Sequence, residues 1–70
     1  MTYDEFLKEA REYLKGNGMK DRAITAFLKS YESYVKEAYD LVKSGDDNID
    51  SQLWGLYMEA WDFEFEGHYC

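Results

Sequence analysis

The most regular pattern in the chain lies in residues 20–44, KDRAITAFLKSYESYVKEAYDLVKS. Apolar side chains recur there on one heptad template, with three positions filled in each repeat. The members are Ile24, Tyr31 and Ala38, then Phe27, Tyr34 and Leu41, then Leu28, Val35 and Val42. A stripe of this kind is typical of an amphipathic helix that covers a core. We therefore predict one helix over residues 20–44, ended by Ser44 and Gly45.

Four basic residues recur at heptad spacing on the face opposite this stripe, namely Arg22, Lys29, Lys36 and Lys43. Glu32 and Asp40 lie four residues before and after Lys36, so oppositely charged side chains alternate along this face. Such alternation is typical of a solvated helix face with ion pairs. The alternative is a site for phosphate or another acidic ligand.

The segments on either side of this stretch also read as helices. Thr2 followed by Glu5 forms a capping-box motif, and Gly16 marks a stop, so we predict a helix over residues 2–15. A third helix is predicted over residues 48–66, because Asp and Asn residues after Gly45 can cap its start. The expected fold is an all-α, three-helix bundle in a single domain over residues 1–70, with a short C-terminal tail.

The third helix carries more apolar surface than one neighbour can cover. Its apolar residues are Ile49, Leu53, Trp54, Leu56, Tyr57, Met58, Ala60 and Trp61. At 100° per residue these spread over roughly 200° of the helix surface. The helix should therefore lie between the other two helices or carry a partner surface.

Residues 61–66, WDFEFE, alternate strictly between aromatic and acidic side chains. Alternation is the period of a strand, but the chain offers no second strand to pair with it. We predict that the third helix continues to about Glu66 and that Gly67 ends it. The alternative is an extended or mobile acidic and aromatic tail over residues 62–70, which could add to a partner's sheet edge.

The net charge of −7 on 70 residues is confined to one part of the chain. All eight basic residues lie in residues 1–45, together with eight acids, whereas residues 46–70 hold seven acids and no base. Phosphate recognition needs a basic surface, so direct binding of nucleic acid is not expected. The acidic imbalance points instead to a basic partner.

His68 and Cys70 are the only histidine and cysteine, and both lie at the C-terminus. Together they supply two ligands, too few to close a tetrahedral zinc site within one chain, although a dimer could supply four. A lone cysteine also excludes an intramolecular disulfide. Neither residue therefore predicts a catalytic or metal site.

Asp46, Asn48 and Asp50 match the first three ligand positions of an EF-hand calcium loop. The match fails further along, because Ser51 replaces the turn glycine and Tyr57 replaces the closing glutamate. Helix capping accounts better for these acids. We expect no enzyme activity, no cofactor and no metal.

The sequence contains no apolar stretch of about 20 residues, the length that crosses a bilayer. The N-terminal residues are acidic where a signal peptide is basic. The chain is therefore expected to be cytoplasmic and to have no membrane partner.

The partner hypothesis rests on the acidic and aromatic residues after Gly45. The candidate partner-binding residues are Asp46, Asp47, Asp50, Trp54, Glu59, Trp61, Asp62, Phe63, Glu64, Phe65 and Glu66. Aromatic anchors within a ring of charge have the composition of a binding hot spot. We expect a small, acidic, non-enzymatic interaction protein that binds a basic surface of a nuclease or another nucleic-acid-binding protein.

In size and acidity the chain resembles small phage and mobile-element inhibitors such as anti-CRISPR proteins and DNA mimics. That resemblance implies an inhibitor that blocks a nucleic-acid-binding surface. The alternatives are a homo-oligomeric helical module, such as a homodimer, and an acidic antitoxin or immunity-type protein. In a further alternative, the acids only keep an aromatic-rich helix soluble or pair with lysines of the bundle.

Overall fold

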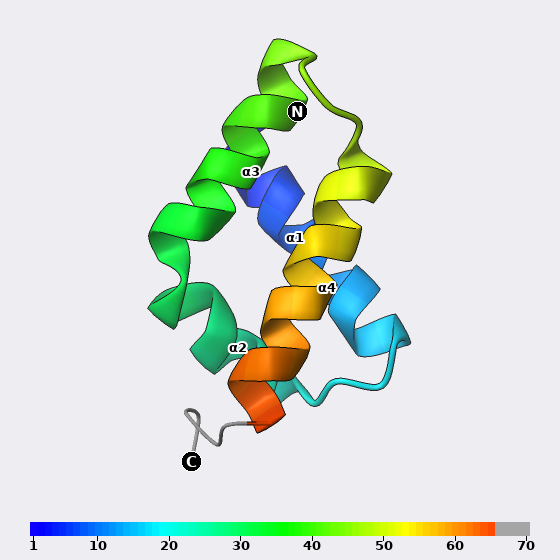
Figure 1. Cartoon of the computed structure of the whole chain (residues 1–70), viewed down its shortest axis with the longest axis vertical. Helices are drawn as coiled ribbons and strands as arrows, with labels where there is room; N and C mark the ends of the chain where they lie inside the picture. Colours follow the sequence, from blue (N-terminus) through cyan, green and yellow to red (C-terminus); the bar gives the residue numbers. More distant parts are fainter. Residues whose placement is uncertain (66–70) are drawn as a thin grey trace.

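The computed structural model describes residues 1–65, which form four α-helices (Figure 1). In chain order they are α1 (Tyr3–Gly16), α2 (Asp21–Ser30), α3 (Glu32–Ser44) and α4 (Ile49–Phe65). Each helix contacts the other three. The predicted all-α fold agrees with the structure, but the predicted number of three helices is wrong.

The difference arises at Tyr31, where the predicted helix over residues 20–44 is broken into α2 and α3. Tyr31 leaves the helical conformation with φ −108° and ψ 31°. A straight helix of about 25 residues would be ~37 Å long, whereas the whole molecule extends 34 Å along its longest axis. The break therefore keeps both halves of the apolar stripe against the bundle.

The Tyr31 ring fixes the position of this break. It stacks on Phe27 with a centroid distance of 4.9 Å and meets Phe63 of α4 edge to face at 5.6 Å. The Tyr31 N–H still donates to the Phe27 carbonyl at 2.9 Å, and the Tyr31 carbonyl accepts from Val35 N–H at 2.9 Å. The last turn of α2 and the first turn of α3 therefore share one residue that packs on α4.

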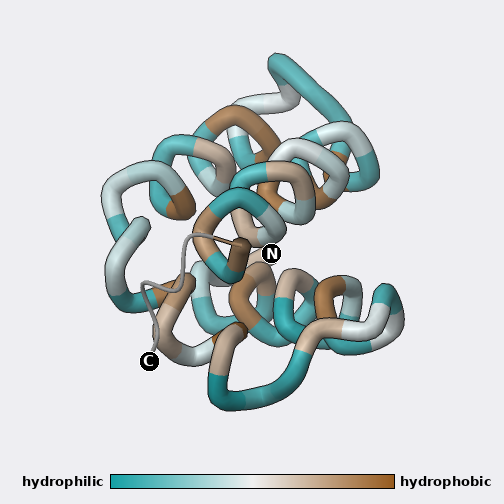
Figure 2. Tube along the Cα trace, turned by 60° about the horizontal axis from the view of Figure 1, so that its bottom comes forward, coloured by the Kyte–Doolittle hydropathy of each residue, from teal (hydrophilic) through white to brown (hydrophobic). Residues whose placement is uncertain are grey.

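The core is formed by side chains from all four helices and by Met19 in the loop between α1 and α2. Figure 2 shows apolar and hydrophilic segments alternating along the helices. The largest side chains in the core with almost no exposed area are Phe6, Leu14, Met19, Ile24, Phe27, Val35, Leu56 and Phe63. Ala10, Ala38 and Ala60 are buried between them, so small residues allow close approach where the helices meet. The four basic residues of the predicted outer face, Arg22, Lys29, Lys36 and Lys43, are all exposed.

The predicted caps of α1 and α4 are present. Thr2 N–H donates to Glu5 Oε1 at 2.7 Å, and Glu5 N–H donates to Thr2 Oγ1 at 3.2 Å. Gly45 ends α3 in the left-handed conformation with φ 82°. The Asn48 side-chain oxygen accepts from Ser51 N–H at 2.8 Å, which caps the start of α4.

The C-terminal part of the predicted third helix is helical as far as the structure describes it. α4 includes residues 62–65, so the alternative of an extended segment is wrong for these residues. The predicted end of the helix at Glu66 and Gly67, and the remainder of the predicted tail, lie outside the described residues.

Acidification should destabilise the protein through two carboxyl groups near the starts of α1 and α4, those of Glu5 and Asp47. Hydrogen bonds from Thr2 lower the pKa of Glu5, and hydrogen bonds from Gln52 and Asn48 lower the pKa of Asp47. A carboxyl whose pKa is lower in the folded state stabilises the fold above its ordinary pKa, and this contribution is lost as pH falls through the lowered value. The Glu5→Gln, Asp47→Asn double variant should therefore lose less stability than wild type between about pH 6 and about pH 3.

Chemical denaturation at each pH measures this difference. A variant with Glu12→Gln, at an exposed position on α1, controls for the removal of a negative charge. A double variant that loses as much stability as wild type would contradict the assignment.

Candidate functional site

The exposed apolar residues of α4 form one stripe along its outer side. We call Trp54, Met58, Trp61 and Phe65 the outer stripe; their exposed fractions are 54%, 51%, 40% and 91%. They are spaced four, three and four residues apart, so they lie on one helix face. The opposite face of α4 contributes Leu56, Ala60 and Phe63 to the core. The predicted apolar arc is therefore divided into two faces, one buried in the bundle and one open to solvent.

Tyr57 holds the two indoles of the outer stripe in place. Its ring lies 5.5 Å from Trp54 and 6.0 Å from Trp61, measured between ring centroids, and it contacts Tyr13 of α1 at 6.2 Å. Side chains that are ordered before binding lose less conformational entropy when a partner docks. Contact with Tyr57 therefore orders Trp54 and Trp61 before a partner docks.

The charges beside the outer stripe are all negative. The sequence of α4 contains no Lys or Arg. Asp50 and Asp62 are exposed, and Glu64 is half-buried. Within residues 1–65, the Oε2 atom of Glu64 is covered without a hydrogen-bond partner.

Glu59 belongs to a different side of α4. Glu59 is half-buried and faces α3. On α3, burial of the Tyr34 hydroxyl raises its pKa, and the nearby negative charges of Glu59 and Glu37 raise it as well. Tyr34 itself lies beside α4, since its hydroxyl oxygen is 3.8 Å from the position of a Cβ at Gly55. Glu59 therefore lies in the contact region of the two helices rather than next to the outer stripe.

Asp46 and Asp47 serve the loop before α4. Asp46 accepts a hydrogen bond from Ser44 Oγ at 3.0 Å. Asp47 accepts from Asn48 N–H at 2.8 Å and from Gln52 Nε2 at 2.7 Å. These bonds explain why both acids precede the helix without requiring a partner.

The structure places one predicted anchor, Phe63, in the core and exposes Met58 beside the tryptophans. Phe63 is 2% exposed and packs against Phe27 with a centroid distance of 5.8 Å, so it is a core residue and not an exposed anchor. Met58 was not among the predicted partner-binding residues, although its spacing from Trp54 and Trp61 places it in the outer stripe. Glu66 lies outside the described residues.

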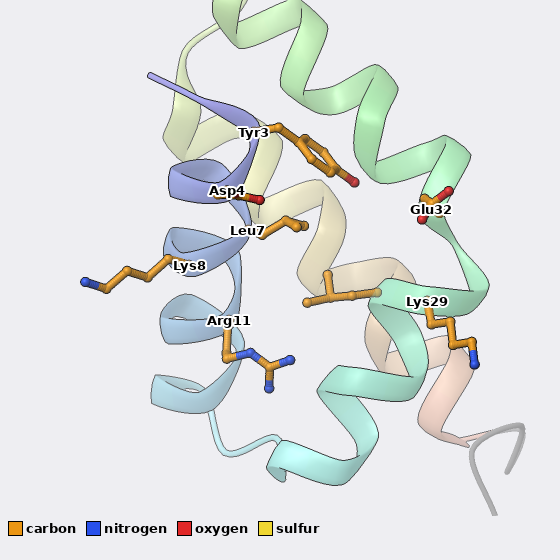
Figure 3. Close-up of a pocket in the computed structure, with 8 residues that line it drawn as sticks. Tyr3, Asp4, Leu7, Lys8, Arg11, Lys29 and Glu32 are labelled. Carbon is orange, nitrogen blue, oxygen red and sulfur yellow. The ribbon is translucent and has the colours of Figure 1, made fainter.

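A groove of about 560 Å³ lies between α1 and the α2–α3 segment, away from the outer stripe (Figure 3). Leu7 and Leu28 form its apolar centre, and both acidic and basic residues line its edges. Arg11 reaches toward α2, donates to Thr25 Oγ1 at 3.0 Å and lies 3.9 Å from Asp21. Lys8 points away from the groove in Figure 3. The groove is lined by both acidic and basic residues, and Arg11 is already bonded to α2. The groove therefore does not indicate one class of ligand.

Of the four residues of the basic face, Lys29 lines this groove together with Glu32. Lys36 lies 3.4 Å from Glu32 and 5.9 Å from the centre of the Tyr3 ring, and Lys43 lies 5.8 Å from the Tyr39 ring.

Among residues 1–65, no group of three or more His, Cys, Asp or Glu could hold a metal ion. In the same part of the chain, every helix is too short or too polar to cross a membrane.

Comparison with known proteins does not assign this chain to a family. No protein-family model, curated protein or solved structure matches it. The outer stripe and its acidic flanks are therefore the features of the molecule from which its function is inferred.

Proposed function

We propose that this protein is a non-enzymatic inhibitor that occupies a basic, nucleic-acid-binding surface of another protein through the outer face of α4. The observation that carries this proposal is the outer stripe, in which two tryptophans, a methionine and a phenylalanine are exposed on a helix whose charges are all negative. Monomeric proteins seldom leave a contiguous apolar patch of this kind exposed without an interaction function.

The charges select the sign of the partner surface. Asp50, Asp62 and Glu64 lie beside the aromatic residues, and carboxylates present the same sign of charge as nucleic-acid phosphates. Lys and Arg side chains that normally contact phosphates would therefore pair with these acids. The aromatic residues would supply buried apolar area at the centre of the interface.

The alternative of a homo-oligomeric module uses the same outer stripe. Two copies joined through α4 would bring carboxylates of both chains together, without a Lys or Arg from either α4 to pair with them. Juxtaposed like charges oppose association. The charge pattern therefore favours a basic partner over a second copy.

Charge reversal near the end of α4 tests the proposal without weakening the helix. The Asp62→Lys, Glu64→Lys double variant places cations in the last turn, where the helix dipole favours them. Wild-type protein should capture a basic, nucleic-acid-binding protein from host extracts, and the captured amount should fall as salt rises. The double variant should bind that protein at least about tenfold more weakly, a loss of about 1.4 kcal/mol.

The matched control is a Glu12→Lys, Asp40→Lys variant, which makes the same charge change at exposed positions on α1 and α3. It should capture as much partner as wild type. Full capture by the Asp62→Lys, Glu64→Lys variant, or binding that salt does not change, would overturn the proposal.

A further inference from the structure

We propose that the partner element that docks on the outer stripe is an amphipathic α-helix with Lys or Arg on both sides of its apolar seam. This inference rests on the proposed function and specifies the shape of the basic surface. Its starting point is the four, three, four spacing of Trp54, Met58, Trp61 and Phe65. That spacing is the alternation of d and a positions in a heptad repeat, with both tryptophans at d.

The stripe has the dimensions of a short helix–helix contact. From Trp54 to Phe65 the helix rises ~16 Å, or about three turns. Because the stripe lies on the face of α4 opposite the core, a second helix can lie along it without displacing α1, α2 or α3. Helices that pack through heptad seams cross at about 20°.

The positions that flank the seam decide what the second helix carries. Gly55 and Asp62 follow the two tryptophans at e positions, whereas Tyr57 and Glu64 precede Met58 and Phe65 at g positions. Asp50 lies one heptad before Tyr57. Every charged flank is acidic, and charges at e and g positions set partner choice in paired helices. A matching helix therefore presents Lys or Arg at its own flanks.

Glu64 and Gly55 support close approach by such a helix. Glu64 is half-buried and places a carboxylate at this flank, where a facing lysine or arginine would pair with it. Gly55 lies in the interior of α4, where glycine costs about 1 kcal/mol relative to alanine. Packing inside the bundle does not require this glycine, because an added Cβ would meet only Tyr34 at 3.8 Å. A small residue at this flank leaves room for a neighbouring helix.

Other occupants of the outer stripe fit the charges less well. A second copy of α4 would bring the same acidic flanks to the seam. Helices that lie on membrane surfaces carry Lys and Arg on their polar faces, and α4 has neither. A basic amphipathic helix matches both the apolar seam and the sign of its flanks.

Three synthetic peptides, each without tryptophan, distinguish the helix from a merely basic partner. The first has about three heptads with leucine and alanine at the seam and lysine at the flanks. The second has the same composition in an order with no helical apolar seam, and the third has glutamate in place of lysine. Titration of the full chain is followed by tryptophan emission, since both tryptophans lie in the outer stripe.

The lysine-flanked helix should shift the emission to shorter wavelength and bind at least about tenfold more tightly than either other peptide. Equal binding of the reordered peptide would overturn the helical inference while leaving a basic partner in place. Equal binding of the glutamate-flanked peptide would overturn both proposals. A stable dimer of the chain alone in sedimentation, lost in a Trp61→Ala variant, would make a second copy the occupant and overturn the inference.

Discussion

Replacing Phe63 with alanine is expected to destabilise the protein by about 3–5 kcal/mol, because it removes a large buried side chain from the junction of α2, α3 and α4. Phe63 meets Phe27 at 5.8 Å and Tyr31 at 5.6 Å between ring centroids. A domain of this size has a stability of about 4–10 kcal/mol. The Phe63→Ala variant should therefore be largely unfolded or should melt far below wild type.

Phe65 provides the matched control two residues further along α4. It is 91% exposed, so the Phe65→Ala variant should change the free energy of unfolding by about 0.5 kcal/mol or less. Thermal and chemical denaturation followed by circular dichroism measures both variants. Equal effects at the two positions would contradict the orientation of α4 in the bundle.

Replacing both Trp54 and Trp61 with alanine should weaken partner binding at least about 100-fold while the fold persists, a loss of about 2.7 kcal/mol or more. The two indoles are the largest side chains of the outer stripe, and hot-spot energies concentrate in such anchors. Because both are partly exposed in the free chain, the variant should lose only about 1 kcal/mol of stability or less.

Titration with the partner captured by wild-type protein measures this loss. A Trp54→Phe, Trp61→Phe variant should recover part of the affinity, because it retains aromatic rings at both positions. Binding by the alanine variant at wild-type strength would place the interface elsewhere on the molecule.

Local signals in the sequence predicted the start of α1, the end of α3 and the start of α4, because each depends on residues a few positions apart. Thr2 and Glu5 bond to each other, Gly45 adopts the left-handed conformation that ends α3, and Asn48 caps α4. Hydrophobic spacing likewise predicted Ile24 and Phe27 of α2 and Val35 and Ala38 of α3, which are buried in the core. These features need no knowledge of how the helices pack.

The break at Tyr31 could not be predicted from the same signals. The apolar heptad continues across it without a change of register, and no proline or glycine marks the position. What decides the break is the fit of Tyr31 and Phe27 against Phe63, more than 30 residues away in the sequence. Contacts at that separation depend on the arrangement of the whole bundle.

The sequence predicted which types of residue form the candidate site, but it did not predict which of them share one face of α4. Phe63 and Phe65 were placed in one set of anchors, although residues two apart on a helix point about 160° away from each other. Periodicity shows that both cannot share a face, but only the neighbours of α4 decide which one is buried. The omission of Met58 has the same origin, because the division between core and outer stripe depends on how α4 packs against the other helices.

The central claim is that the outer face of α4 contacts a basic partner, and the emission of Trp54 and Trp61 reports on that face alone. The decisive measurement is the emission spectrum of the full chain when it is saturated with the captured partner, after subtraction of the partner's own signal. We predict a shift to shorter wavelength and protection from an aqueous quencher, because both indoles leave water. Saturated binding with unchanged emission and unchanged quenching would contradict the claim.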